Sequence, residues 1–424
     1  MDAYRNLGYL EWTRHQLEDA RQALEGALKL SPGDEYANYY LGRVEMDSGI
    51  YPKALTHLEK CKGVWPNDPG FFLHMATGYL SLRRDSDARH ALAHVQKLDL
   101  TDEQSVKYGA LLIASQENAA GLEVFGRMRK QHSNAEWTLV NLALAQLLAG
   151  QPGDAFSTAQ SICTPQGPAA AWTIMGIAAA ETQDHEHASE AFRKAAELAP
   201  GQEERWLDLT RELMEQQHYI DAVAAARQGL EQLPRSYALR LRLGAADMKS
   251  GHYQEAEDVF RDLIAKGDPQ PTSAIGLAQV MLREARFDAA AEILEDAQKR
   301  LGTSFLLVYF QGIALDRAGK PGEAITKFQE AVRLNPKNAE AHQWLGKAEL
   351  RARQVDQAIA QLEEALRLDP NCQPARRLLA QAYAIEKEPG QAMQQTEPGE
   401  IPKAMGEEAA DFFFPAWEMP PATQ

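Results

Sequence analysis

The chain has 424 residues, of which 45% are hydrophobic and 25% are charged, and it carries a formal net charge of −16. These proportions are typical of a soluble protein and unlike those of a disordered or membrane-embedded chain. The excess of acidic residues argues against nucleic acid as a partner, because nucleic-acid affinity comes largely from neutralising phosphates, and it argues equally against an anionic membrane surface.

The cysteines and the lengths of the apolar runs further limit the class of protein and its cellular compartment. Cys61, Cys163 and Cys372 are odd in number and far apart in the sequence, so we do not expect a disulfide framework. No apolar run reaches the roughly 18 residues that span a bilayer, and residues 1–12 lack the basic leader and apolar core of a secretory signal. We therefore expect a cytoplasmic protein without membrane insertion.

A set of small and apolar residues recurs about every 34 residues along most of the chain. The segment 305–338 shows the set in full, and its Gly312, Ala324, Phe328 and Pro336 have counterparts at the same spacing in both directions. A period of this length is typical of a solenoid, in which each repeat is one supersecondary unit that cannot bury its apolar face alone.

Taken in chain order, the pattern predicts eleven consecutive units within residues 1–372. The first two units, 1–34 and 35–68, agree at every diagnostic position, whereas the fourth, about 102–135, is the most degenerate. Position 8 is small in nearly every unit: Gly8, Gly42, Ala76, Gly109, Ala143, Gly176, Gly244, Ala278, Gly312 and Gly346. Position 20 is alanine in every unit except the fourth, where Gly121 stands: Ala20, Ala54, Ala88, Ala155, Ala188, Ala222, Ala256, Ala290, Ala324 and Ala358.

The recurrence of these residue types at fixed repeat positions has a physical explanation. Small side chains at positions 8 and 20 let the two antiparallel helices of one unit approach closely, while large apolar side chains at positions 4, 7 and 24 fill the space between units. Proline at position 32, as at Pro200 and Pro336, follows the second helix because proline cannot continue a helix. Residues 319–322, Gly-Lys-Pro-Gly, are typical of the turn between the two helices.

The pattern W-x2-L-G-x2-Y, then A-x3-F, then A and P, resembles the tetratricopeptide repeat. The sixth unit, about 169–202, matches best, with Trp172, Gly176, Ala188 and Phe192 in place. The resemblance covers residues 1–372 and implies an all-α fold, a right-handed α-solenoid superhelix of about eleven helix-turn-helix repeats.

The residues after the eleventh repeat form two further segments. Residues 373–387 match the first helix of another unit whose second helix does not follow, so we expect a capping helix that covers the last apolar face. Residues 388–424 contain six prolines and seven acidic residues against one lysine, and this composition predicts an acidic, Pro-rich disordered tail.

An aromatic cluster stands out inside this tail, formed by Phe412, Phe413, Phe414 and Trp417. Four large aromatic residues without a core of their own favour a short linear motif over an accidental apolar end, because such residues exposed without purpose would promote aggregation. The motif could bind another protein in trans or dock in the groove of its own chain. The sequence leaves both open.

The first helix of each tetratricopeptide repeat lines a concave groove, and the resemblance implies that positions 2, 5, 9, 12 and 13 face a ligand. These positions give the following partner-binding candidates: Tyr9 and Trp12 in the first repeat, Tyr36, Tyr39 and Arg43 in the second, and Trp137, Val140, Leu144 and Leu147 in the fifth. An aromatic entrance and an apolar middle suit an extended or helical peptide with apolar anchors. Alternatively, some of these side chains pack against neighbouring loops.

A subset of tetratricopeptide proteins grips the acidic C-terminal motif of chaperones with Lys or Arg and Asn from three successive repeats. Arg5 matches the first of these positions, but Tyr9, Tyr40, Gly70 and His74 replace the expected polar and basic partners. A bound carboxylate would therefore lack paired donors, which argues against this mode.

No catalytic or cofactor motif is present in the sequence. A Gly-rich phosphate loop, a nucleophile elbow and an HExxH motif are all missing, so we expect no enzyme activity and no cofactor. His90 and His94 are spaced for one helix face, with no Cys or carboxylate at ligand spacing nearby in the sequence, and His185 and His187 lie in a turn around Glu186. Surface histidines explain both pairs better than a metal site.

The sequence thus predicts a non-catalytic scaffold or adaptor that binds a protein or peptide partner in the groove. The alternative is a recruitment or regulatory module, or a fragment, of a larger multidomain or multi-subunit enzyme. The start at Met1 motivates this alternative because it falls directly in repeat phase.

Overall fold

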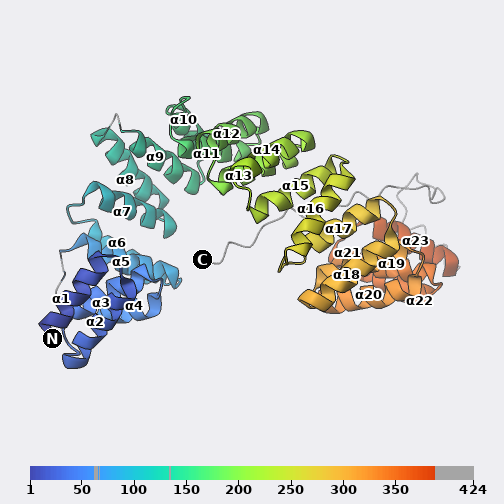
Figure 1. Cartoon of the computed structure of the whole chain (residues 1–424), viewed down its shortest axis with the longest axis horizontal. Coiled ribbons are helices and arrows are strands. Elements are labelled where there is room, and N and C mark those ends of the chain that lie inside the picture. The colour runs from blue at the N-terminus through green and yellow to red at the C-terminus, as the bar shows by residue number, and fades with distance from the viewer. Residues whose placement is uncertain (62–64, 66, 133–134, 387–424) are drawn as a thin grey trace. The chain divides into compact units, whose positions relative to one another are not determined.

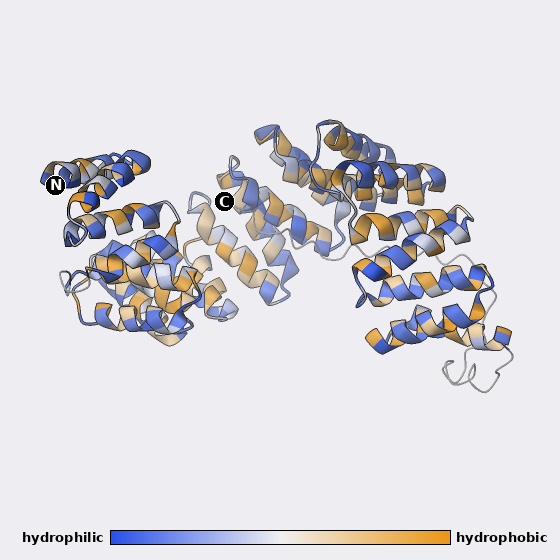
Figure 2. Cartoon of the chain, turned by 90° about the horizontal axis from the view of Figure 1, so that it is seen from below, coloured by the Kyte–Doolittle hydropathy of each residue, from blue (hydrophilic) through white to orange (hydrophobic). Residues whose placement is uncertain are grey.

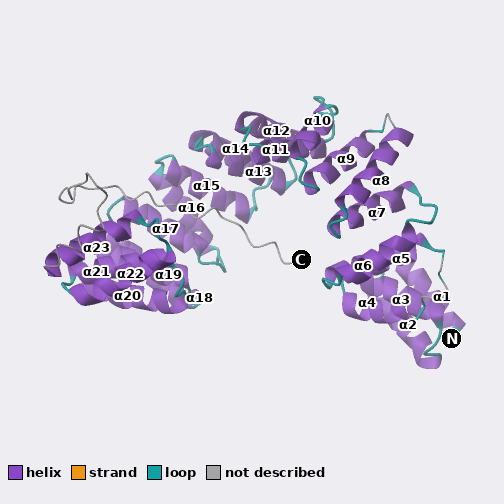
Figure 3. Ribbon diagram, turned by 180° about the vertical axis from the view of Figure 1, so that it is seen from behind, coloured by secondary structure: helices purple, strands orange, loops and turns teal. Residues whose placement is uncertain are grey.

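The computed structural model describes residues 1–386 apart from 62–64, 66 and 133–134. Every regular element in this described part is an α-helix (Figures 1 and 3). The all-α repeat solenoid expected from the sequence is therefore confirmed.

The helices follow one another with short connections. The first fourteen are α1 Asp2–Thr13, α2 Leu17–Leu30, α3 Glu35–Asp47, α4 Tyr51–Glu59, α5 Pro69–Ser81, α6 Asp85–Val95, α7 Asp102–Ala114, α8 Asn118–Gln131, α9 Glu136–Leu148, α10 Pro152–Gln160, α11 Ala169–Glu181, α12 His185–Leu198, α13 Glu203–Glu215 and α14 Tyr219–Gln232. The others are α15 Tyr237–Lys249, α16 Tyr253–Ala265, α17 Thr272–Arg283, α18 Phe287–Leu301, α19 Phe305–Arg317, α20 Pro321–Leu334, α21 Ala339–Arg351, α22 Val355–Leu368 and α23 Gln373–Glu386.

Consecutive helices pack as hairpins, for example α1 with α2, α11 with α12 and α19 with α20. The first helices of neighbouring hairpins also contact each other, as α1 does α3, α5 does α7 and α19 does α21. First helices, which are the odd-numbered ones, therefore lie side by side from α1 to α11 in the first unit and from α17 to α23 in the second. The last helix, α23, contacts both α21 and α22 and so caps the final hairpin, as expected.

The chain divides into two compact units, Met1–Arg242 and Leu243–Gln424. The candidate surface described below lies within the first unit. Figure 2 shows hydrophobic and hydrophilic residues mixed along the helices of both units.

The two helices of a hairpin approach closely where a small residue on one helix faces a large residue on the other. A Cβ added to Gly42 of α3 would stand 2.7 Å from Cγ of Leu58 on α4, which is closer than real Cβ contacts. Leu58 itself is fully buried. The alanines at position 20 are all fully buried as well: Ala20, Ala54, Ala88, Ala155, Ala188, Ala222, Ala256, Ala290, Ala324 and Ala358.

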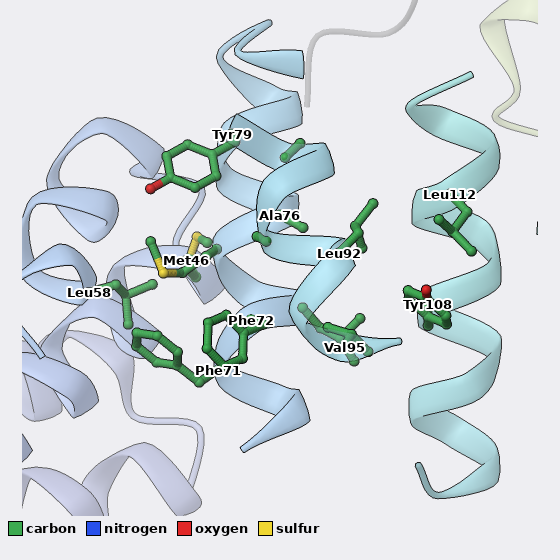
Figure 4. Close-up of a cluster of buried hydrophobic side chains, with 14 of the residues drawn as sticks. Met46, Leu58, Phe71, Phe72, Ala76, Tyr79, Leu92, Val95, Tyr108 and Leu112 are labelled. Atoms are coloured by element: carbon green, nitrogen blue, oxygen red, sulfur yellow. The ribbon is translucent and has the colours of Figure 1, made fainter. Parts of the chain in front are cut away.

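Large apolar side chains connect one hairpin to the next. Phe71 and Phe72 of α5 lie beside Leu58, and Val95 of α6 lies between α5 and Tyr108 of α7 (Figure 4). These residues belong to one buried cluster that runs from α3 to α9. Continuous burial of this kind explains how a repeat that is too small to fold alone becomes stable in an array.

Every hairpin turn contains one residue in the left-handed backbone region. At Arg83, whose φ is 57°, the N–H donates to Leu80 O, and the following N–H of Arg84 donates to Tyr79 O. This pair of bonds is the Schellman motif that ends a helix. The turn residues with positive φ are His15, Gly49, Arg83, Gln116, Gly150, Gln183, Gln217, Gly251, Ala285, Gly319 and Arg353.

The degenerate fourth repeat also forms two helices, α7 and α8. Its first helix begins with a capping box, in which the Thr101 hydroxyl accepts from the Gln104 N–H and the Gln104 side chain accepts from the Thr101 N–H. Two otherwise unsatisfied backbone donors are thereby paired, which fixes the start of the helix where the repeat pattern is weakest.

Cys61 is fully buried, as expected of a small core residue, and all three cysteines are free. Leu7 holds a position that is buried in every other repeat, and Tyr4 holds one that is buried in most of them, yet both are about half exposed. The reason is that, among the described helices, α1 packs mainly against α2 and α3.

Candidate functional site

The predicted groove residues of the first two repeats come together on α1 and α3. These two helices contact each other, so their outward-facing aromatic side chains form one surface. The rings of Tyr9, Trp12 and Tyr40 lie pairwise close, with centroids 6.1 Å apart for Tyr9 and Trp12, 5.0 Å for Tyr9 and Tyr40, and 6.1 Å for Trp12 and Tyr40. We call the side chains of Tyr9, Trp12, Tyr36, Tyr40 and Arg43 the aromatic surface.

Trp12 is held in place from two sides. Its indole Nε1 donates to Oδ2 of Asp47 at 2.7 Å, and the guanidinium of Arg43 lies 4.9 Å from its ring centroid. A cation over the face of an indole is attracted by the ring quadrupole. The ring of Trp12 is therefore fixed before any partner binds.

Arg43 connects the surface to the layer beneath it. Its Nη1 donates to the hydroxyl of Tyr39 at 3.0 Å, while its Nε is buried and finds no partner in the described part of the chain. Tyr39 is only 6% exposed and stacks on Trp65, with centroids 4.6 Å apart. Burial raises the pKa of Tyr39. Tyr39 thus supports the aromatic surface from below and offers little area of its own.

Tyr36 forms the other edge of the surface. Its ring meets Trp65 edge to face at 5.6 Å, and the guanidinium of Arg5 lies 5.6 Å from its centroid. Arg5 in turn pairs with Asp34 at 3.1 Å and with Asp2 at 3.0 Å. Because Arg5 already has two carboxylate partners, it is not available as a free cation.

The fifth-repeat candidates lie on α9 and differ in burial. Trp137 and Leu144 are about 40% exposed, whereas Leu147 is 8% exposed and Val140 packs against the cluster that contains Leu147. Trp137 also borders a cavity of about 450 Å³, whose other lining residues are Asp102, Glu103, Val106 and Lys107 of α7. Only Trp137 and Leu144 therefore present area to a partner here.

His74 of α5 and Lys107 of α7 are two basic residues that the groove pattern did not predict as site residues. Nζ of Lys107 on α7 lies 3.4 Å from Nε2 of His74 on α5, and Nδ1 of His74 contacts the carbonyl oxygen of Gly70. Burial, and next the charges of Arg43 and Lys107, lower the pKa of His74 to about 3, so this ring is neutral at physiological pH. Burial and the charge of Arg43 also lower the pKa of Lys107.

A repeat-register signal could have found these residues. Tyr40, His74 and Lys107 all hold position 6 of their repeats, the second, third and fourth. The family pattern assigns positions 2, 5, 9, 12 and 13 to the groove and does not include position 6.

The histidine pairs are exposed and have other partners. His94 stacks on Phe72 at 4.8 Å, and the rings of His90 and His94 are tilted with centroids 6.2 Å apart. His185 bonds to Glu212 and His187 to Asp184, each at 2.8 Å. Within the described residues no group of three His, Cys, Asp or Glu side chains could hold a metal ion.

The tail motif of Phe412, Phe413, Phe414 and Trp417 lies outside the described residues. None of the helices described is long and apolar enough to cross a membrane.

Several solved structures resemble this chain at low identity. The structure of yeast Tom70 has a TM-score of 0.44 and 15% identity, and the match covers 92% of this chain and 98% of that one. The Cut9 structure, from an APC/C hetero-tetramer of Cut9 and Hcn1, gives 0.42 and 13%, with 90% and 96% covered. A thermophilic TPR protein of Thermus thermophilus gives 0.38 and 20%, with 43% and 100% covered. No curated protein matches the chain.

Family models match the chain in both units. Three models of the tetratricopeptide repeat match, one at residues 213–275 and 317–382, one at 5–69 and one at 169–202. Together these ranges cover more than half of the chain and include the α1 and α3 helices that hold the aromatic surface. The chain belongs to the tetratricopeptide repeat family.

Proposed function

We propose that this protein is a non-catalytic scaffold or adaptor that binds a protein or peptide along the first-helix face of its repeats. The observation that carries this proposal is the aromatic surface. Tyr9 and Tyr36 are nearly half exposed on a face where Trp12 and Arg43 are already fixed by neighbours. Tyr, Trp and Arg are the residues that most often dominate the energy of protein interfaces.

The chemistry of the surface indicates what it would bind. Rings held by neighbouring rings and by a guanidinium lose little conformational entropy when a partner arrives, so apolar contact with them contributes more of its free energy to binding. An extended or helical peptide with apolar or aromatic anchors fits such a surface. Trp137 and Leu144, about 40% exposed on α9, would give a longer peptide a second contact.

Affinity capture with matched variants tests this function. The intact chain is compared with a Tyr9→Ser/Tyr36→Ser variant and with a control, Ile220→Ser/Leu198→Ser, which removes two exposed apolar residues from second helices. Partners that use the aromatic surface should be lost with the tyrosine variant and kept with the control. Equal recovery of all partners by the three proteins would contradict the proposal. Recovery of enzyme subunits would favour the recruitment-module alternative.

Whether residues 388–424 dock in the groove of their own chain is tested with a partner found by the same capture experiment. A partner identified by capture is titrated against the intact chain and against a chain that lacks residues 388–424. If the tail docks in the groove of its own chain, its removal should increase partner affinity. An unchanged affinity would contradict intramolecular docking.

A further inference from the structure

Positive charge collects on the first helices of the second unit, although the whole chain carries a net charge of −16. The first helices α17, α19, α21 and α23 together carry six Lys or Arg residues against four acidic residues. The second helices α18, α20 and α22 carry nine acidic residues against five basic ones. An anionic ligand is therefore favoured on the first helices of this unit and disfavoured on the second helices.

Two of these cations share one buried carboxylate, that of Asp316 on α19. Nη1 of Arg351 on α21 donates to its Oδ1 at 2.8 Å, and Nζ of Lys347, one turn earlier on α21, lies 3.5 Å from its Oδ2. The next residue after Asp316, Arg317, makes no ion pair or hydrogen bond with a described residue. We call the side chains of Arg317, Lys347 and Arg351 the cationic site. They hold repeat positions 13, 9 and 13, which the family pattern assigns to the groove.

Asp316 does not neutralise the cationic site. Burial, and then the charges of Arg351 and Arg317, lower the pKa of Lys347, whereas the charge of Asp316 raises it. The three cations therefore lie within electrostatic reach of one another, and one carboxylate offsets only one of them. The site keeps two positive charges.

The other acidic residues of α21 stand apart from the site. Glu340 lies in the first turn of the helix and accepts from the Tyr309 hydroxyl at 3.3 Å. Glu349 is 3% exposed, and burial raises its pKa to about 7. A cation close to Glu349 would have held that pKa down, so the carboxyl group of Glu349 does not neutralise the cationic site.

The cations are held in place, and two of them reach solvent. Nζ of Lys347 lies 4.0 Å from the ring centroid of Trp344, whose ring packs on Phe328 with centroids 6.0 Å apart. The side chain of Asp316 is fully buried, whereas those of Lys347 and Arg351 are 20% and 39% exposed. Both bonds from Arg351 to Asp316 use Nη1, which leaves Nε and Nη2 for a ligand. A second anion can thus bind from solvent without displacing Asp316.

We propose that the cationic site binds the phosphoryl group of a phosphoserine or phosphothreonine in a partner peptide. A phosphoryl group carries about −1.5 to −2 charge at pH 7 and three strong acceptor oxygens, which match the two remaining positive charges. A single carboxylate would leave part of this charge unneutralised. Guanidinium groups pair with phosphate through two parallel bonds, and the site has two of them. This inference rests on the proposed function, because it names a class of peptide for the first helices of the second unit.

The test compares three peptide pools on the full-length chain. Each pool consists of fluorescent nine-residue peptides with random flanking residues, and the central residue is phosphoserine, serine or glutamate. Fluorescence anisotropy should show that the phosphoserine pool binds about tenfold or more tightly than the serine pool, the size expected for charge-assisted bonds, and also more tightly than the glutamate pool. Equal binding of the phosphoserine pool and either other pool would overturn the inference. So would inorganic phosphate that binds as tightly as the phosphoserine pool, because the ligand would then be free phosphate.

Variants show whether the preference comes from the cationic site. Arg317→Gln/Arg351→Gln should reduce the preference for phosphoserine to about twofold or less. The control Arg333→Gln/Arg367→Gln removes the same charge from exposed positions of α20 and α22 and should leave the preference within about twofold of the parent value. A double variant of the cationic site that keeps the full preference would overturn the inference.

Arg317→Gln alone covers the case in which the double variant fails to fold. It removes a cation that pairs with no described carboxylate, so it should fold, and it should lower the preference at least about threefold. An unchanged preference would overturn the inference. Loss of captured partners with Tyr9→Ser/Tyr36→Ser would still support the proposed function in that case, because those tyrosines lie in the first unit. The two failures are therefore distinguishable.

Discussion

Gly312 of α19 faces the ring of Phe328 on α20 so closely that a Cβ on Gly312 would stand 2.7 Å from Cε1. Phe328 is fully buried and has the rings of Tyr309 and Trp344 beside it, so it has little room to move. We expect Gly312→Ala to lower the free energy of unfolding by about 1–3 kcal/mol, because overpacking outweighs the roughly 1 kcal/mol gained in helix propensity. Urea denaturation followed by circular dichroism measures this.

Gly322 provides the matched control for that substitution. Gly322 lies near the start of α20, the helix that also carries Phe328, and a Cβ on Gly322 would meet no atom within 4 Å. Gly322→Ala should therefore be neutral or stabilising, by up to about 1 kcal/mol. Equal effects of the two substitutions would show that the close approach of Gly312 to Phe328 carries no energetic weight.

Ala285 marks a turn at which the backbone conformation disfavours its own side chain. Its φ is 57°, in the left-handed region that costs a residue with a Cβ about 1 kcal/mol or more. Ala285→Gly should raise the free energy of unfolding by roughly 0.5 kcal/mol, since the relief of strain exceeds the extra entropy of the unfolded chain. The control Ala265→Gly, at the end of α16, should instead lower it. A destabilised Ala285→Gly chain would contradict the prediction.

Arg286 and Glu257 join two neighbouring hairpins of the second unit. Nη1 and Nη2 of Arg286 donate to the two oxygens of Glu257 at 2.6 and 3.2 Å, and this contact holds the pKa of Glu257 below its usual 4.5. Arg286→Gln should lower the free energy of unfolding by about 1 kcal/mol at neutral pH, because the buried carboxylate then keeps Arg261 as its one ionic partner among the described residues.

The pH dependence of this pair follows from the depressed pKa. The stabilisation is present above about pH 4.5 and is lost as the pH falls through the lower folded-state value, so the deficit of Arg286→Gln should shrink in acid. Lys299→Gln, which removes an exposed pair with Glu295, should have almost no effect at either pH. A deficit that is as large in acid as at neutral pH would rule out the ionic contribution.

The repeat register was enough to predict the helices, because positions 8 and 20 tolerate little but Gly and Ala. The clash that a Cβ at Gly42 would make with Leu58 shows the physical basis of that restriction. Even the fourth repeat forms both helices, where the Thr101 capping box supplies a local signal that the repeat pattern lacks.

The surface residues were less predictable than the helices. Tyr39 and Leu147 hold groove positions, yet both are buried. The loop residue Trp65 stacks on Tyr39, and Leu147 belongs to a hydrophobic cluster formed with residues of α10, α11 and α12. Repeat position fixes the direction of a side chain, while its exposure depends on which loop or neighbouring helix lies above it.

Glu349 of α21 should make the stability of the protein fall as the pH rises. It is 3% exposed, its Oε2 finds no hydrogen-bond partner among the described residues, and burial raises its pKa from 4.5 to about 7. Between these two values the folded state keeps a proton that the unfolded state has released, so the free energy of unfolding decreases with pH across this window.

Replacing Glu349 with glutamine tests this, because the amide resembles the protonated acid at every pH. Glu349→Gln should match the parent chain below about pH 4.5 and exceed its free energy of unfolding above pH 7, by about 1–3 kcal/mol. The free energy of unfolding of Glu349→Gln should still decrease somewhat with pH, because Glu45 is also buried with a pKa raised to about 7. Glu255→Gln, at an exposed position of α16, should follow the parent chain at both ends of the range. Urea denaturation midpoints of the three chains at pH 4 and pH 8 measure these differences. A Glu349→Gln chain that is less stable than the parent at pH 8 would contradict the prediction, because it would show that the surroundings stabilise the ionised carboxylate.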